Sequence, residues 1–577
     1  MGKDFVAPLR DENNGCWLNG QNDEIIRVTN TDDNDTDNNK LRGSMSESRQ
    51  IDAVIVGAGF AGMYMLHRLR SAGLDVQVIE AGGGVGGTWY WNRYPGARCD
   101  VESMEYSYQF SEDLQQQWNW TERYAPQPEI LAYANHVADR FELRKNIQFD
   151  TRVTAAHFNE TENRWQVTTD QGEGLSARFC VMATGCLSST NLPKFEGLDT
   201  FEGEWYHTGL WPHEGVDFTN KRVAIVGTGS SAIQSIPQLA KQAGHLTVFQ
   251  RTPNFSIPAH NRQLEVNFVA AVKADYPAFR AANNLQATCF GSRSEGNDQS
   301  VFAASEAQRQ QHFESKWQIG GFGFLSAFND LLATREGNKF AADFVREKIR
   351  QTVKDPATAE SLCPDQVIGC KRICVDINYF ETYNRDNVTL VSVKDHPIER
   401  VTEQGLVVNG EEFAFDCLVF ATGFDAMTGS LARMDIRGRA GLVLKDKWAA
   451  GPRTYLGIGS AGFPNLFTIS GPQSPSVLTN MICSIEQHVN WVTDCILAMN
   501  ERGLTTIEAD QQAEDAWVEH VNDIAGETLY PSCNSWYLGA NVPGKPRVFM
   551  PYVGGLPVYA DKCNEVAQNN YAGFVLA

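Results

Sequence analysis

The stretch IDAVIVGAGFAG, residues 51–62, decides the fold of this chain. It is a continuous apolar run that ends in a Gly-x-Gly-x-x-Gly loop, and a helical pattern, MYMLHRLRSAG, and a second apolar run, LDVQVIE, follow it. This order predicts a strand–helix–strand unit of the dinucleotide-binding type. Gly57 permits the tight turn, Gly59 lets the backbone approach a pyrophosphate, and Gly62 lets the helix pack on the strand. Glu80 ends the second run, where a carboxylate can bind ribose hydroxyls.

A second unit of the same order begins with KRVAIV at residues 221–226. The loop GTGSSA, the helical pattern IQSIPQLAKQAG and the strand pattern HLTVFQ follow it. Its predicted nucleotide contacts are Gly227, Gly229 and Ser230. An NAD site carries an acidic residue at the end of the next strand, whereas this chain has Arg251 followed by Thr252. Because an arginine can pair with a 2′-phosphate, the second site predicts NADPH in preference to NADH.

The overall pattern predicts an α/β fold with two Rossmann-like dinucleotide-binding domains and a helical insertion in the second. FAADFVREKIRQTV is typical of helices in that insertion, and residues 480–503 predict one long amphipathic helix that a glycine closes. The chain is predicted to begin with a disordered acidic tail at 1–50. The first dinucleotide-binding domain is predicted in two parts, at 51–186 and 416–577, and its later part includes a C-terminal segment that contacts cofactor and substrate. The second dinucleotide-binding domain is predicted at 187–415, with its helical insertion at about 255–365.

Composition and charge exclude several classes of function. The 577 residues carry 49 Lys and Arg against 70 Asp and Glu, and the net charge of −21 opposes binding to nucleic acid or to anionic lipid. Hydrophobic residues make up 42% of the chain, which suffices for globular cores, yet no apolar run predicts a membrane span. The start MGKDFV carries neither a secretory nor a myristoylation signal, so we expect a cytoplasmic protein.

The 13 cysteines predict neither a disulfide framework nor a metal site. They are odd in number and scattered, and no two of them form a Cys-x-x-Cys pair. Reduced thiols in a cytoplasm are the expectation that fits this pattern.

Two longer stretches are not explained by the fold alone. They are GGTWYWNRYPGARCD at residues 86–100 and FEGEWYHTGLWP at residues 201–212. Together they resemble the signatures of type I Baeyer–Villiger monooxygenases, and the likeness extends from about residue 51 to residue 577. The stretches KWAAGPRTYLG, AGFPNLF and SWYLGANVPGKPRVFM are most similar to the phenylacetone monooxygenase branch of that family.

The resemblance implies a single-chain flavoprotein that binds FAD in the first domain and NADPH in the second. Such enzymes insert one oxygen atom of O2 next to a ketone carbonyl to give an ester or lactone, by way of a C4a-peroxyflavin. The implied partners are a small-molecule ketone and O2, and the expected state is a monomer or a weak homo-oligomer.

Other classes of flavoprotein fit the sequence less well. A flavin-dependent N- or S-oxygenase of the same superfamily is the main alternative, because it shares both nucleotide loops. Such enzymes usually lack Trp211-Pro212 and the long segment that ends at Asp100, and these two features therefore favour the Baeyer–Villiger family. A disulfide reductase needs a pair of redox cysteines soon after the first loop, and only Cys99 is nearby. A flavin-binding sensor without catalysis is disfavoured because Asp100, Lys371 and Arg372 are all retained.

The resemblance also assigns catalytic and cofactor-binding residues. Arg372 matches the active-site arginine of the family and Asp100 matches the aspartate that holds and tunes it, at a sequence separation of 272. A fixed guanidinium can stabilise negative charge without proton transfer. The implied cofactor contacts are Gly87, Thr88 and Trp89 in the first fingerprint, Asp100, Lys371 at a phosphate, Trp536 at the nicotinamide cofactor and Met481 near the substrate pocket.

Trp89 and His207 each allow an interpretation other than direct catalysis, and two further features concern the substrate pocket. Trp89 suits core packing as well as cofactor contact, and His207 is expected to link domains and not to exchange protons. The segment at 475–478 resembles the pocket-lining bulge of the phenylacetone branch. Cys186 stands where that branch has glutamine, which leaves the substrate scope open.

Overall fold

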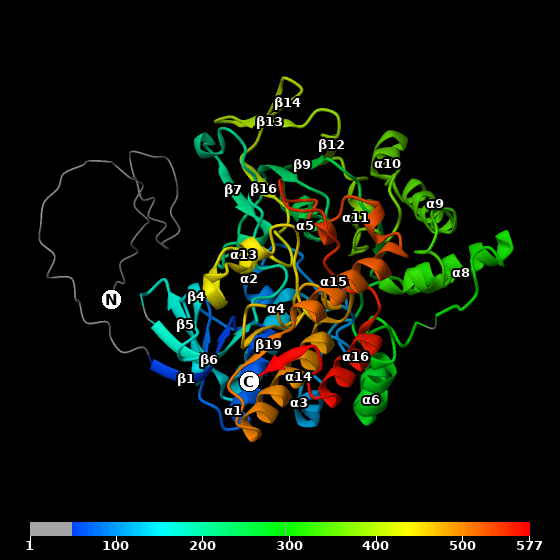
Figure 1. Cartoon of the computed structure of the whole chain (residues 1–577). Helices are drawn as coiled ribbons and strands as arrows, with labels where there is room; N and C mark the ends of the chain where they lie inside the picture. The colour runs from blue at the N-terminus through cyan, green and yellow to red at the C-terminus, as the bar shows by residue number, and fades with distance from the viewer. Residues whose placement is uncertain (1–48, 173, 295) are drawn as a thin grey trace, which may run out of the picture.

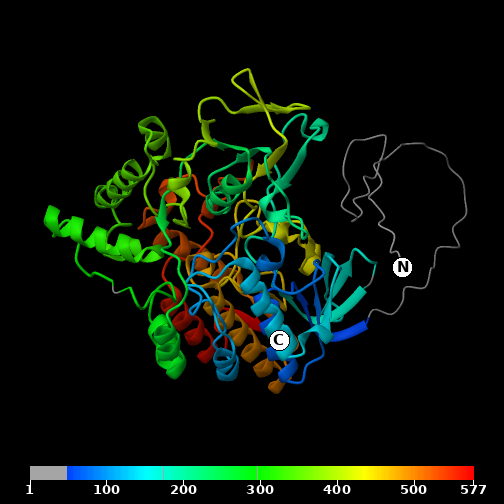
Figure 2. The same ribbon diagram turned by 180° about the vertical axis from the view of Figure 1, so that it is seen from behind.

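The computed structural model describes residues 49–172, 174–294 and 296–577. The predicted acidic tail therefore lies outside the described residues, apart from Arg49 and Gln50. These two residues begin the first strand, so the folded part starts two residues before the predicted boundary. Figures 1 and 2 show two sheets in different halves of the molecule, each with helices packed beside it.

The first sheet is built around the first glycine loop. β1 (Arg49–Val56) pairs in parallel with β2 (Val76–Ile79) and β6 (Gly174–Met182), and α1 (Phe60–Ser71) connects β1 to β2. Helices cover this centre, so its strands are apolar in continuous runs. The sheet order is β17-β4-β5-β6-β1-β2-β3, with β18 also on β6. The other strands are β3 (Ile147–Gln148), β4 (Val153–Asn159), β5 (Arg164–Thr169), β17 (Asp435–Arg437) and β18 (Leu466–Thr468).

The second sheet is parallel throughout and contains the second glycine loop. Its order is β12-β9-β8-β16-β7, and α5 (Ser230–Gln242) connects β8 to β9. The prediction placed residues 416–577 with the first domain, but β16 pairs with β8 and β7. The predicted boundary at 415/416 therefore falls one strand too early, because β16 completes the second sheet before the chain returns. The strands are β7 (Glu204–His207), β8 (Arg222–Val226), β9 (His245–Gln250), β12 (Val388–Ser392) and β16 (Cys417–Phe420).

The helical insertion lies between β10 (Ser256–Pro258) and β11 (Cys374–Asp376), which pair in parallel. The three-residue strand β10 falls inside the segment predicted to lack strands, because so short a strand leaves no periodic pattern. In Figure 1 the insertion forms the right-hand side of the molecule. Its helices are α6 (Val266–Ala274), α7 (Tyr276–Asn284), α8 (Glu306–Ile319), η4 (Gly321–Ala327), α9 (Arg335–Thr352) and α10 (Pro356–Leu362).

The predicted long amphipathic helix is α14 (Met481–Glu501), which packs against α1. The Asn480 side chain caps it by accepting the Ile482 N–H, and Gly503 follows its end with φ +66°. The cap places Met481 in the first turn of α14, where it packs against the hydrophobic core that includes β1 and α1. Two further helices, α15 (Gln511–Gly526) and α16 (Leu556–Gln568), complete this half.

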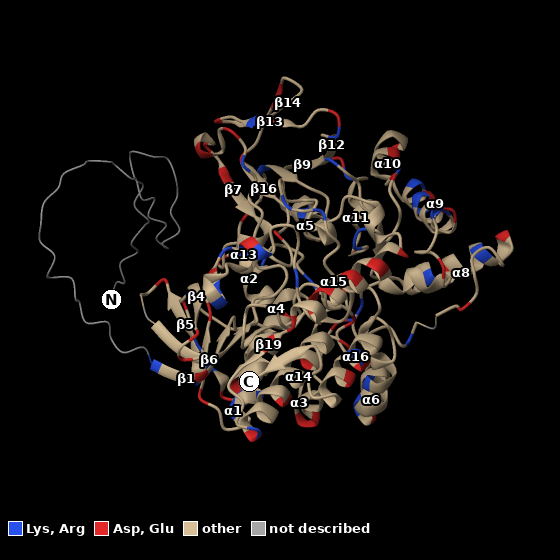
Figure 3. Cartoon of the chain, in the orientation of Figure 1, with Lys and Arg blue, Asp and Glu red and all other residues tan. Residues whose placement is uncertain are grey.

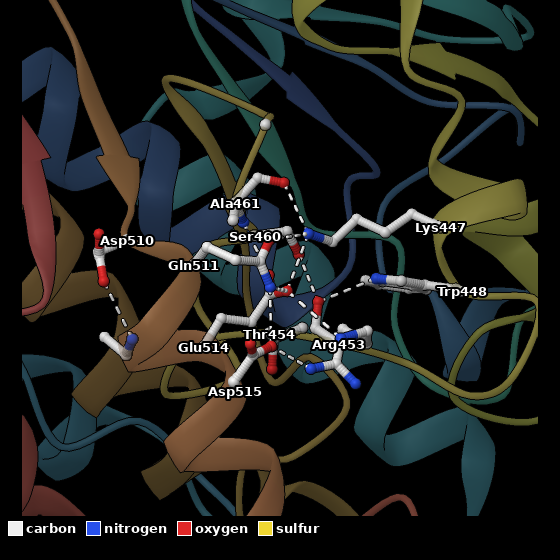
Figure 4. A network of polar contacts seen from close by, with 12 residues as sticks. Lys447, Trp448, Arg453, Thr454, Ser460, Ala461, Asp510, Gln511, Glu514 and Asp515 are labelled. Carbon is white, nitrogen blue, oxygen red and sulfur yellow. Dashed lines mark hydrogen bonds and ion pairs between the residues drawn. The ribbon is translucent and has the colours of Figure 1, made fainter.

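A buried ion network ties α15 to the loop before β18 (Figure 4). Glu514 is fully buried, and its carboxylate lies 2.8 Å from Lys447 Nζ and 3.6 Å from Arg453 Nε. The same carboxylate accepts the Ala461 N–H at 2.7 Å. Since Arg453 also pairs with Asp515, four charged side chains hold α15 in place.

The structure corrects the prediction that the cysteines are all reduced. Cys370 and Cys533 form a disulfide, with their Cα atoms 6.1 Å apart and a sequence separation of 163. The other described cysteines are free thiols. No spacing motif announces this pair, because the fold and not the local sequence brings the two cysteines together.

Charge and hydropathy on the folded chain follow the composition. In the view of Figure 3, Lys and Arg are interspersed with Asp and Glu over the described part of the chain. No helix among the described residues is both long enough and apolar enough to cross a membrane. Within the same residues, no three His, Cys, Asp or Glu side chains are grouped as a metal site would require.

Candidate active site

The first glycine loop leaves the N-terminus of α1 open to an anion. Gly57 follows β1, and Gly59 precedes the helix without a side-chain cap and without an acidic residue in the first turn. Uncapped N–H groups at a helix N-terminus bind anions such as a pyrophosphate. A Cβ at Gly62 would lie 1.8 Å from the Gly57 carbonyl oxygen, so this close turn requires glycine.

Glu80 lies at the carboxyl end of β2 beside this loop. It is 5% exposed, and its two carboxylate oxygens accept the N–H of Ala58 at 2.6 Å and of Gly82 at 2.7 Å. Burial raises the pKa of Glu80. An acceptor fixed in this way suits the ribose hydroxyls of a dinucleotide, so the residues present fit FAD.

The first fingerprint packs directly against the glycine loop. A Cβ at Gly87, where φ is +53°, would lie 2.8 Å from the Gly59 Cα. Thr88 is exposed at the start of α2 (Thr88–Trp91). Trp89 is buried in the first core and its Nε1–H donates to the Tyr106 hydroxyl at 3.1 Å. The structure thus brings Gly87 to the predicted FAD site, and it places Trp89 in the core packing that the sequence also allowed.

The second glycine loop has the same open helix terminus. Gly229 precedes α5 with no side-chain cap and no acidic residue in the first turn. A Cβ built at Gly229 would meet no atom within 4 Å, so the backbone here has room for a bound group. Gly227 follows β8, and the Ser230 hydroxyl lies 3.3 Å from Cys374 Sγ. These residues fit a second dinucleotide.

A pocket of about 240 Å³ lies at the end of β9, where a 2′-phosphate is predicted. Arg251 and Lys371 are the cations that the sequence assigned, and Lys394 is a third that no motif indicates. Burial and the nearby Arg251 charge lower the pKa of Lys371. In the described chain neither Arg251 nor Lys371 forms an ion pair, whereas Lys394 pairs with Asp365 at 3.1 Å. The lining residues are Arg251, Thr252, Pro253, Asp365, Gln366, Lys371, Lys394, Cys533 and Asn534.

Arg372 and Asp100, 272 residues apart, form a bidentate pair. Arg372 Nε and Nη2 donate to the two Asp100 oxygens, each at 2.9 Å, and Nη1 donates to the Val477 carbonyl at 2.6 Å. The guanidinium also lies over the ring of Phe322, 4.6 Å from its centroid. Burial alone would lower the pKa of Arg372, but Asp100 and Tyr537 outweigh burial and raise it. The guanidinium therefore stays charged in a fixed orientation.

The remaining predicted residues gather in one apolar cluster beside this pair. Cys186 and Val477 are buried in it, and Met481 and Trp536 are half-buried against it. The Cys186 thiol lies 3.0 Å from the Ser476 hydroxyl. Ser476 immediately precedes Val477, whose carbonyl accepts the hydrogen bond from Arg372. Tyr537 and Phe322 also contact Arg372. Tyr537 lies in the stretch SWYLGANVPGKPRVFM but was assigned no role there, and Phe322 lies in none of the quoted motifs.

His207 is the last residue of β7, and its ring connects this strand to the loops at Thr422 and Asn191. Its Nδ1 accepts the Gly209 N–H at 3.0 Å, and its Nε2 lies 3.2 Å from the Thr422 hydroxyl. Thr422 in turn donates to the Asn191 carbonyl at 2.7 Å. Burial lowers the pKa of His207 to about 4, so the ring is neutral near pH 7. This geometry suits a structural link and not proton exchange.

Comparison with known proteins places the chain in a family. A model of the pyridine nucleotide-disulphide oxidoreductase family matches residues 54–275. A Baeyer–Villiger monooxygenase of Pseudooceanicola batsensis is 44% identical over 544 residues, which cover 94% of this chain and 98% of that protein. A phenazine N-monooxygenase of Lysobacter antibioticus is 42% identical over 536 residues, covering 92% of this chain and 98% of its own length.

Solved structures agree with these relatives. The structure of an oxidized steroid monooxygenase bound to NADP has a TM-score of 0.87 and 52% identity, covering 91% of this chain and 99% of that one. The structure of OTEMO in complex with FAD and NADP has a TM-score of 0.88 and 43% identity, covering 92% of this chain and 100% of that one. The chain therefore belongs to the Baeyer–Villiger monooxygenases, as its fingerprints indicated. It is a flavoprotein monooxygenase that uses FAD and NADPH, and its place in the phenylacetone branch stays a prediction.

Replacing Arg251 by alanine should weaken the use of NADPH selectively. The substitution removes a cation that forms no ion pair with the described residues and that lines the pocket predicted to hold the 2′-phosphate. A charged hydrogen bond contributes about 1.5 to 3 kcal/mol, so the KM for NADPH should rise about 10- to 100-fold while that for NADH stays nearly constant. Steady-state kinetics with both cofactors measure the difference. Arg385→Ala, an exposed arginine outside the pocket, is the control, and equal losses with both cofactors would reject the assignment.

Proposed function

We propose that Arg372 is the catalytic residue of this Baeyer–Villiger monooxygenase and that Asp100 positions it. The observation that carries the proposal is the bidentate pair between them, which holds a permanent cation beside the apolar cluster of Met481 and Trp536. When bound, FAD supplies the activation of oxygen and NADPH supplies the hydride. Arg372 stabilises negative charge as it develops on the oxygen atoms during attack on the ketone carbonyl.

The other residues bind and orient. The loops at Gly57–Gly62 and Gly227–Ser230 hold the two pyrophosphates, Glu80 holds a ribose, and Arg251 with Lys371 holds the 2′-phosphate. Val477 and Asp100 fix the rotation of the guanidinium, so no side chain has to reorganise when charge develops. Trp536 and Met481 exclude water from the apolar side of the pocket.

The substrate we propose is a small-molecule ketone, with a steroidal ketone as the first candidate because a steroid monooxygenase of known structure is 52% identical to this chain. A panel of aromatic, linear, cyclic and steroidal ketones, with product analysis, tests this proposal. At least one ketone should yield an ester or lactone with stoichiometric use of NADPH. NADPH consumption that no ketone accelerates would overturn it. A cytoplasmic location and a monomeric or weakly associated state remain predictions.

Oxygenation of nitrogen is the second candidate, because the phenazine N-monooxygenase is 42% identical over nearly the whole chain. Adding phenazines, tertiary amines and thioethers to the same panel separates the two activities. Turnover of these compounds without turnover of any ketone would favour the second candidate.

A further inference from the structure

The disulfide Cys370–Cys533 joins the two segments that carry the active-site side chains. Cys370 is fully buried and immediately precedes Lys371 and Arg372. Cys533 is half-buried and lies three residues before Trp536. One covalent bond thus connects the loop with the phosphate-binding and catalytic cations to the segment with the predicted nicotinamide contact.

The disulfide is the covalent part of this connection. Across the described chain, every hydrogen bond of residues 530–536 goes to a residue between 528 and 547, within the same C-terminal segment. None of these reaches the loop at 369–372, although the next residue, Tyr537, interacts with Arg372 in that loop. The position of the segment against the loop therefore depends on the covalent bond, on the contact between Tyr537 and Arg372, and on apolar packing around Tyr537.

The bond also lies in the wall of the cation pocket. Cys533 and Asn534 line that pocket together with Arg251 and Lys371. A segment that is free to move away would remove one wall and leave the two cations facing solvent. A nucleotide held by the cations would in turn cover the half-buried Cys533.

We propose that the Cys370–Cys533 disulfide is a positioning element that closes the NADPH pocket, and that its reduction opens the pocket and weakens NADPH binding. The proposal rests on the assignment of this pocket to NADPH. In the reduction, a small dithiol supplies two electrons and two protons. The sulfur–sulfur bond breaks, two cysteine thiols form, and the dithiol becomes a cyclic disulfide. Because coupling between two sites is reciprocal, bound NADP⁺ should protect the bond.

The test uses the FAD-loaded holoenzyme without ketone, so that it does not depend on ester formation. The KM for NADPH is measured by NADPH oxidation in wild type before and after dithiothreitol, and in the double variant Cys370→Ser/Cys533→Ser. Reduction and the double variant should each raise this KM about fivefold or more, with a small change in kcat. The double variant should no longer respond to dithiothreitol. Cys363→Ser, which removes a free half-buried thiol of the same domain, should behave as wild type.

Protection by nucleotide is the second measurement and does not require a variant to fold. Thiols released by dithiothreitol are trapped with an alkylating reagent and counted by mass spectrometry at Cys370 and Cys533. NADP⁺ should slow their release and NAD⁺ should not, and reoxidation should restore the low KM. An unchanged KM for NADPH in the reduced wild type would overturn the proposal, as would a double variant that still responds to dithiothreitol. If the oxidised wild type had the same KM for NADPH as for NADH, this result would instead contradict the assignment of the pocket to NADPH.

Discussion

Arg372→Ala should abolish most ester formation while leaving FAD bound and NADPH consumption intact. The guanidinium is held by Asp100 on one side and by the Val477 carbonyl on the other, so it stabilises developing charge without reorganisation. Loss of such a fixed charged donor costs about 3 kcal/mol or more in the transition state, which is roughly a hundredfold or greater loss of rate. Product yield per NADPH consumed, measured with a ketone from the panel, reports the effect.

Two further variants separate charge from position. Arg372→Lys keeps the charge but cannot make the bidentate pair, so its ester yield should lie between those of the wild type and Arg372→Ala. Asp100→Ala should be milder than Arg372→Ala, because Asp100 orients the guanidinium and does not meet the substrate. Near wild-type ester formation by Arg372→Ala would refute the catalytic role given to this residue.

Glu514→Gln should destabilise the fold more than any other single change considered. The substitution leaves the Lys447 ammonium, whose side chain is only 10% exposed, without its 2.8 Å partner. Removing one member of a buried ion pair costs about 3 to 5 kcal/mol, because the other charge stays buried and uncompensated. Thermal unfolding of the holoenzyme should show a clearly lower melting temperature.

The matched control is Glu519→Gln, in the same helix α15 but at an exposed position. Surface substitutions of this kind usually change stability by less than about 0.5 kcal/mol. If Glu514→Gln had the same melting temperature as Glu519→Gln and the wild type, the network of Figure 4 would not stabilise the fold.

The parts of the fold that follow a local period were predictable from the sequence. β1 with α1, β8 with α5, and the helix α14 each have a run, a loop or a cap within a few residues, and each forms where the pattern predicted. The three-residue strand β10 has no period to detect, and β16 carries an apolar run that suits either sheet. Only strand pairing, which is a property of the whole fold, assigns β16 to the second sheet.

The candidate site divides in the same way. The glycine loops and Glu80 are encoded locally, so their chemistry follows from the residues themselves. The pairing of Arg372 with Asp100 came only from the family resemblance, and the structure supplies its geometry. Phe322, Lys394 and the disulfide were not foreseen, because each depends on contacts between segments distant in sequence.

The most direct test of Baeyer–Villiger activity follows the oxygen atom. Wild-type holoenzyme, NADPH and a ketone that it converts are incubated under ¹⁸O₂ in ordinary water, and the product is analysed by mass spectrometry. The product should be an ester or lactone that carries one ¹⁸O atom in its new C–O–C linkage. A product without the label, or label found only in nitrogen or sulfur oxides when amines or thioethers are supplied, would contradict this activity.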